Sequence, residues 1–343
     1  MKNLRREIHN IANANRKKRY IGGDTFNFEM VIDGASENVF LDATPLKNNR
    51  NLKFDEVEVG KGKIHINICL PKFIDENNVM PFSMADLIML ETIKNDVESA
   101  LNQALKGIID DKIDVLTAPA KSIECNITKR VAGDSTCSQV LNLINRSFPE
   151  GTNVVFQRAS IKCKYDKENE TVIIRKRNYY VLKAYDKTLQ QRKSGNLDVD
   201  SGLLRIELVM QDRTIIKMFC GKSTIREVLT ERGLMTIIKE YKRIFLEDVI
   251  KEHILPCIND VVDILYKTLK EKDSQLEAIA LHKELIMDEE ILRRALVKWY
   301  KFNGYSEERA KRNADTYICR CRIKYGFPKN VIDTMREFKK LCD

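Results

Sequence analysis

The chain has 343 residues, of which 43% are hydrophobic and 32% are charged, a balance typical of a soluble globular protein with a sizeable core. No stretch approaches the roughly 20 apolar residues of a membrane-spanning helix, and the start, MKNLRREIHN, lacks the apolar segment of a secretory signal. We therefore expect a cytoplasmic protein with no membrane partner. The nine cysteines are odd in number and scattered, which fits neither a disulfide framework nor a zinc site.

The net charge of +9 is concentrated at the two ends of the chain. Residues 1–19 carry seven basic side chains and one acidic one, and residues 291–343 carry fourteen basic and six acidic ones. The middle of the chain is mildly acidic. Two basic ends suggest a polyanionic partner such as nucleic acid, with ordinary solvated charge as the alternative.

In chain order, the first long region alternates apolar and polar residues from about Thr25 to Gln211, which predicts strands. One strong helix interrupts it at SMADLIMLETIKNDVESALNQALKG, residues 83–107. Ser83 and Asp86 have the spacing of a capping box at the start of this helix. A second, shorter helix is predicted at Ser135–Arg146.

The second long region, from Arg213 onward, has helical periodicity, with breaks predicted near Pro256, Gly304 and Gly326–Pro328. Strands followed by helices indicate the α+β class, with an antiparallel sheet packed on helices by one face. We expect three parts: a basic N-terminal segment at 1–24, a sheet domain at 25–250, and a helical, basic C-terminal domain at 251–343.

Four expected strands each have one clean apolar face. Their sequences are KIHINICL (63–70), KSIECNIT (121–128), VLKAYDKTL (181–189) and SGLLRIELVM (201–210). Alternation places a polar set on the opposite faces: His65, Asn67, Glu124, Asn126, Lys183, Tyr185, Lys187, Arg205 and Glu207. A merely solvated sheet face would also be polar, but the histidine and the tyrosine favour a site.

A tyrosine is the candidate nucleophile in this set. Its hydroxyl has an ordinary pKa near 10, so attack by Tyr185 at neutral pH needs cations that stabilise the phenolate. Lys183 and Lys187 are the candidates for that role. Arg205 is suited either to grip a phosphate oxygen or to pair with a carboxylate as a structural salt bridge.

Carboxylates on the same face suggest a metal site. Glu124 and Glu207, with His65 or Asn67, would supply the ligands of a divalent ion, and oxygen-rich ligands suit Mg²⁺ or Mn²⁺. Such an ion would polarise a scissile phosphate. For His65, a surface histidine without a ligand role is the alternative.

The motifs HINICLPKFIDENNV, SIECNIT, KAYDKTLQ and SGLLRIEL, taken in this order, resemble those of the filamentous-phage gene II replication initiators and related phage and plasmid rolling-circle initiators. The resemblance covers residues 60–250. It implies a fold like that of the HUH endonucleases, with Tyr185 as the nicking nucleophile. It also matches Glu124 to the acidic residue of the middle strand, and Arg205 and Glu207 to an Arg-x-Glu strand.

Two positions depart from the family pattern. The middle strand reads Ser122-Ile123-Glu124, where the family often has Arg-Ile-Asp, and His65-Ile66-Asn67 keeps only the first histidine of a His-hydrophobe-His motif. Tyr179 is a rival nucleophile, because alternation predicts the same face for it as for Tyr185.

The resemblance implies a metal-dependent, site-specific endonuclease and ligase for single-stranded DNA that forms a covalent 5′-phosphotyrosyl intermediate. Its partners would be single-stranded or supercoiled origin DNA and the host helicase and polymerase. The alternatives are a non-catalytic DNA-binding replication accessory protein and a conjugative relaxase.

The segment ERAKRNADTYICRCRIK, residues 308–324, is the candidate DNA-binding helix. A solvated helix face is the alternative. The basic residues expected to follow DNA are Arg309, Lys311, Arg312, Arg320 and Arg322.

Overall fold

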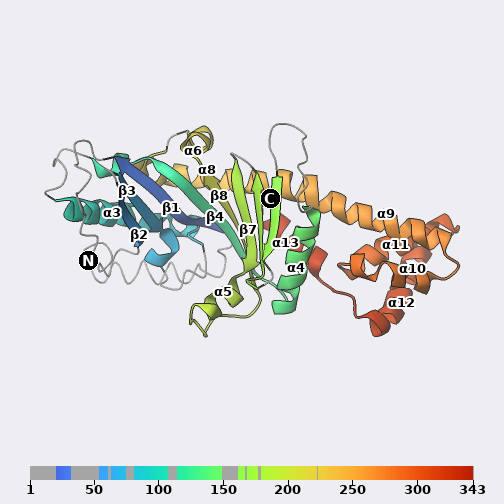
Figure 1. Ribbon diagram of the computed structural model, residues 1–343. Coiled ribbons are helices and arrows are strands. Elements are labelled where there is room, and N and C mark those ends of the chain that lie inside the picture. Colours follow the sequence, from blue (N-terminus) through green and yellow to red (C-terminus); the bar gives the residue numbers. More distant parts are fainter. Residues whose placement is uncertain are drawn as a thin grey trace.

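The computed structural model describes residues 21–31, 54–60, 63–74, 81–106, 114–148, 161–166, 168–176, 179–221 and 223–342. Within them, a twisted sheet of eight strands has the order β2-β3-β1-β4-β8-β7-β6-β5, and every neighbouring pair is antiparallel (Figure 1). The predicted α+β class with an antiparallel sheet is therefore confirmed. The strands are β1 Ile21–Val31, β2 Phe54–Gly60, β3 Lys63–Cys69, β4 Ala120–Arg130, β5 Ile161–Asp166, β6 Thr171–Lys176, β7 Tyr180–Asp186 and β8 Leu203–Gln211.

Helices lie in the β3–β4, β4–β5 and β7–β8 connections, and the region after β8 is mostly helical (Figure 1). The α-helices are α3 Leu90–Leu105, α4 Asp134–Ser147, α5 Lys187–Lys193, α6 Arg213–Cys220, α7 Ile225–Val228, α8 Glu231–Arg243, α9 Leu255–Glu271, α10 Gln275–Leu281, α11 Glu289–Phe302, α12 Glu307–Tyr325 and α13 Val331–Cys342. A π-helix, η5 Ile244–Ile254, joins α8 to α9, and short 3₁₀ turns lie at η2 Leu70–Phe73, η3 Met84–Met89, η4 Val115–Thr117 and η6 Lys283–Leu285.

One face of the sheet is apolar and packs on helices. Its residues include Ile66, Ile123, Leu182 and Ile206, all fully or almost fully buried, in contact with a core that α3, α4 and α8 also build. Each such side chain stabilises the fold by about 1.5–3 kcal/mol relative to an exposed one. The Tyr241 hydroxyl of α8 donates to the Ile206 carbonyl (3.0 Å), which ties this helix to the centre of the sheet.

The predicted helix 83–107 is present as η3 followed by α3, and its capping box is formed. The Ser83 hydroxyl accepts from the Ala85 amide, and the Ser83 amide donates to the Asp86 carboxylate (2.9 Å). The predicted helix at 135–146 is α4. No helix among the described residues is long and apolar enough to cross a membrane.

The break predicted near Pro256 does not occur. α8, η5 and α9 follow one another without interruption, because Ile244 and Leu255 at the junctions keep helical dihedral angles. The wider π turn, in which the Leu255 amide donates to the Ile250 carbonyl, relieves the clash that proline causes in an α-helix. The predicted domain boundary between residues 250 and 251 therefore lies inside a continuous helix.

The end of the chain returns to the sheet domain. α9 extends away from the sheet to α10, α11 and α12, and α13 then packs beside α4 and η5 (Figure 1). An ion pair joins Lys129 of β4 to Glu337 of α13. The breaks predicted at Gly304 and Gly326 are confirmed, and Gly326 ends α12 in the left-handed conformation (φ 62°) that glycine adopts most easily.

Candidate functional site

The strand register brings most of the predicted site residues onto one face of the sheet. In the central strands Asn126, Glu207 and Lys183 form one cross-strand row, and Thr128, Arg205 and Tyr185 form the next. Glu124 precedes Asn126 by two residues on β4, so it lies on the same face. We call the following residues the ionic cluster: Asp24, Glu124, Asn126, Thr128, Lys183, Tyr185, Arg205 and Glu207.

Arg205 is the centre of the ionic cluster and is completely buried. Its Nη1 lies 2.9 Å from Asp24 Oδ2, and its Nε donates to Thr128 Oγ1 (2.8 Å). Thr128 in turn donates to Asn126 Oδ1 (3.0 Å), and Asn126 donates to Asp24 Oδ2 (2.7 Å). Of the two roles left open for Arg205, the structural salt bridge is the one its contacts form.

Asp24 closes this set of hydrogen bonds, but the sequence pattern did not indicate it as a site residue, because residue 24 falls in the expected N-terminal segment 1–24. It belongs to β1 and lies within the irregularity between Gly23 and Phe26, where the register with β4 shifts. A Cβ on Gly22 would lie 1.9 Å from the Phe82 carbonyl oxygen, so a glycine is needed for this close approach. The available signal was an acidic residue directly after Gly-Gly at the start of an alternating strand.

Tyr185 has only 6% of its surface exposed, and its hydroxyl donates to Glu207 Oε1. The Arg205 guanidinium lies 3.7 Å from the same oxygen. Burial raises the pKa of Tyr185 well above its usual value and Glu207 adds to the rise, while Arg205 opposes it. The hydroxyl is therefore protonated at neutral pH in this arrangement.

Lys183, one of the two predicted phenolate-stabilising lysines, contacts carboxylates. Its Nζ lies 3.4 Å from Glu124 Oε1 and 3.8 Å from Glu207 Oε2. Burial, and after it repulsion from Glu207, raises the pKa of Glu124 to about 7, although Lys183 pulls it down. The lysine thus bridges two carboxylates that otherwise repel each other.

Lys187, the other predicted lysine, is the first residue of α5 and is only 3% exposed. Its ammonium donates to Gln190 Oε1 (2.9 Å). Burial, followed by the positive charge of Arg205, lowers the pKa of Lys187 to about 7. Asp186 caps α5 by accepting from the Leu189 amide (2.9 Å), which fixes the chain direction at this point.

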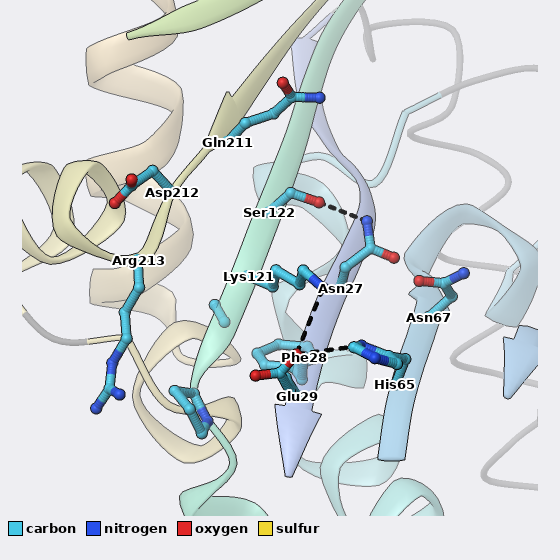
Figure 2. A pocket seen from close by; sticks show the side chains of 12 residues that line it. Asn27, Phe28, Glu29, His65, Asn67, Lys121, Ser122, Gln211, Asp212 and Arg213 are labelled. Atoms are coloured by element: carbon cyan, nitrogen blue, oxygen red, sulfur yellow. Dashed lines mark hydrogen bonds and ion pairs between the residues drawn. The ribbon is translucent and has the colours of Figure 1, made fainter. Parts of the chain in front are cut away.

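The other two predicted metal ligands, His65 and Asn67, line a separate depression of about 710 Å³, which we call the open pocket (Figure 2). His65 Nδ1 lies 3.5 Å from Glu29 Oε2, and Lys121 lies 3.4 Å from the same oxygen. The open pocket is lined by Asn27, Phe28, Glu29, His65, Asn67, Pro119, Ala120, Lys121, Ser122, Gln211, Asp212 and Arg213.

The predicted metal ligands therefore fall into two groups, and the side chains as placed do not fit a resident divalent ion. Lys183 contacts both Glu124 and Glu207, and Asp24 is paired with Arg205. No group of three or more histidine, cysteine, aspartate or glutamate side chains in the described part of the chain could hold a metal.

Tyr179 does not share a face with Tyr185, contrary to the prediction. It lies in a turn before β7 begins at Tyr180, so strand alternation does not extend to it. Its hydroxyl lies 3.4 Å from a Glu240 carboxylate oxygen and accepts from Arg243, and both partners lie on α8 on the helical side of the sheet.

The five basic residues predicted to bind DNA are all exposed on α12, but they do not form one stripe. Lys311 pairs with Glu307 (3.0 Å), and Arg322 pairs with Glu289 (2.6 Å). At 3.6 residues per turn, these two lie on the opposite side of the helix from the other three. The three residues on the other side of α12 are Arg309, Arg312 and Arg320.

No protein-family model matches this chain, and no curated protein matches it.

Proposed function

We propose that the protein is a tyrosine-dependent DNA nicking and joining protein that initiates rolling-circle replication, with a fold of the HUH-endonuclease type. The observation that carries the proposal is the hydrogen bond from the Tyr185 hydroxyl to the Glu207 carboxylate. Nucleophilic catalysis generally uses a nucleophile that is hydrogen-bonded to a base, and the base is oriented by further groups. Arg205 and Lys183 orient that base, at 3.7 and 3.8 Å.

In the proposed reaction, the Tyr185 oxygen attacks a backbone phosphorus, and the hydroxyl proton of Tyr185 passes to Glu207. The bond from phosphorus to the 3′ oxygen breaks, and that oxygen takes up a proton to become a free 3′-OH. The 5′ phosphate stays on the tyrosine as a phosphodiester, and re-attack by a 3′-OH reverses the step and rejoins the strand. The bond energy is kept in the ester, so no nucleotide cofactor is needed.

The proposed reaction requires that a DNA phosphate reach the buried Tyr185 hydroxyl. With 6% of its surface exposed, Tyr185 reaches a phosphate only if its hydroxyl becomes accessible when DNA binds. Such access would also admit water, which lowers the burial cost of the phenolate and so its raised pKa.

A non-catalytic DNA-binding accessory protein is the second candidate, and the burial of Tyr185 favours it. A tyrosine that is protonated and enclosed among ionic side chains also fits a purely structural role. The two candidates differ in one product, the covalent protein–DNA adduct.

The decisive experiment incubates the protein with labelled single-stranded and supercoiled DNA carrying the origin of its own replicon. Reactions contain Mg²⁺, Mn²⁺ or excess chelator, and denaturing gels detect labelled protein. Wild type is expected to form the adduct and a nicked product. Tyr185→Phe keeps the ring but removes the attacking oxygen, so DNA binding should persist and the adduct disappear.

Tyr179→Phe is the matched control, because its hydroxyl contacts Arg243 and Glu240 on the other side of the sheet. It should form the adduct at close to the wild-type rate. An adduct that survives in the Tyr185 variant would refute the assignment. No adduct with wild-type protein under any of the three conditions would leave the accessory role as the conclusion.

A further inference from the structure

Two partly buried carboxylates on neighbouring strands share one lysine. Glu124 and Glu207 come from β4 and β8, and the Lys183 ammonium of β7 lies 3.4 Å from the first and 3.8 Å from the second. The side chains of the two glutamates are 19% and 8% exposed, so neither carboxylate is freely solvated. Two like charges so placed need a cation to remain ionised together.

No other cation among the described residues is within ion-pair distance of Glu124. Arg205 reaches Glu207 at 3.7 Å but makes closer contacts with Asp24 and Thr128. His65 contacts Glu29 in the open pocket (Figure 2).

We infer that Lys183 is the resident cation of this carboxylate pair and occupies the role that a divalent metal ion would otherwise fill. An ammonium and a divalent ion compete for the same oxygens, because a magnesium-sized ion must approach them to about 2.0–2.1 Å. A positive charge held within 4 Å of both carboxylates repels such an ion strongly where solvent is partly excluded. The pair should therefore bind divalent ions weakly in the wild-type chain and more tightly without the ammonium.

The test titrates wild type and Lys183→Met with Mn²⁺ at pH 7.5, following free Mn²⁺ by electron paramagnetic resonance and binding by calorimetry. The variant should bind one Mn²⁺ at least about tenfold more tightly than wild type. Adding Glu124→Gln to Lys183→Met should abolish the gain. Lys183→Gln, which is polar and uncharged, should show the same gain and provides a second variant if the methionine substitution prevents folding.

Lys176→Met is the matched control. Lys176 is also a partly exposed strand lysine in an ion pair, but its partner is Asp248 (2.9 Å), and it bridges no second carboxylate among the residues that the structure describes. It should gain no Mn²⁺ affinity. The inference is overturned if wild type binds Mn²⁺ as tightly as folded Lys183→Met. It is also overturned if the folded Lys183 variants gain no Mn²⁺ affinity.

This inference rests on the contacts of Lys183 and does not require that the protein nick DNA. The titration contains no DNA, so its result stands apart from the adduct experiment. If both proposals hold, wild type should form the adduct equally well in chelator.

Discussion

The ionic cluster and the open pocket lie on the same polar face of one sheet, but Arg205 in the first and Glu29 in the second differ in burial and in the length of their contacts. In the cluster, Arg205 is enclosed and contacts Asp24 and Thr128 at 2.8–2.9 Å. In the pocket, Glu29, His65 and Lys121 form longer contacts of 3.4–3.5 Å beside open space (Figure 2). Similar residue types therefore have different energetic roles in the two places.

Burial, more than composition, decides how a polar side chain on this sheet face contributes to stability. Buried ion pairs depend strongly on each partner, since losing one leaves an uncompensated charge. Exposed pairs contribute little. The cluster should therefore dominate stability, and the pocket should tolerate change and remain available to a ligand.

The largest effect is expected from Arg205→Ala. Removing the guanidinium leaves Asp24 buried without its ion-pair partner at 2.9 Å and weakens the field around Glu207. The free energy of unfolding should fall by roughly 3–5 kcal/mol, measured by urea denaturation. Arg213→Ala, an exposed arginine of the open pocket, is the control and should change it by less than about 0.5 kcal/mol. Equal effects would show that the buried arginine stabilises the fold no more than the exposed one.

Tyr185→Phe should cost less, because it removes one hydrogen bond to a charged partner and keeps the ring. Urea denaturation should show a loss of about 1.5–3 kcal/mol. Asn67→Ala in the open pocket is the matched measurement and should cost less than this. A stability gain in Tyr185→Phe would mean that the bond to Glu207 does not stabilise the native state.

Lys187→Met tests, through pH, a buried lysine that feels the charge of Arg205 in the ionic cluster. The pKa of Lys187 is lowered from 10.5 to about 7 by burial and then by Arg205, so between these values the unfolded chain binds a proton that the native chain lacks. The contribution of Lys187 to the free energy of unfolding of wild type therefore rises with pH across that window. The destabilisation caused by burying this lysine is greatest below pH 7. Lys187→Met should be more stable than wild type at pH 7 by at least about 1.4 kcal/mol, the value of one pKa unit.

The check for Lys187 is a pair of denaturation series from pH 7 to pH 9.5. The difference between variant and wild type should shrink as pH rises. A difference that stays constant with pH would show that Lys187 is solvated in the native protein.

The smallest effect is expected in the open pocket itself. His65→Ala removes a partly exposed contact with Glu29 and should change the free energy of unfolding by less than about 1 kcal/mol. Thermal and urea denaturation at pH 7 provide the measurement. A loss as large as that of Arg205→Ala would show that the pocket, too, is a structural element.

Much of the architecture follows from local pattern. Alternation correctly assigned Ile66, Ile123 and Ile206 to the buried face, since a strand turns successive side chains to opposite sides. The Ser83 capping box and the glycine at 326 correctly predicted a helix start and a helix end. The helix break predicted at Pro256 was wrong because the π-helix accommodates the proline. The face predicted for Tyr179 was wrong because the strand begins one residue later.

The α+β class, the two faces of the central strands and the common face of Glu124, Tyr185 and Glu207 follow from local pattern alone, because they depend on periodicities of two and 3.6 residues. The pairing of Asp24 with Arg205, 181 residues away, is visible only in the folded chain. The same holds for the two carboxylates that Lys183 bridges and for His65, which lies apart from them in the open pocket. Strand order and burial depend on long-range packing, and no local pattern contains them.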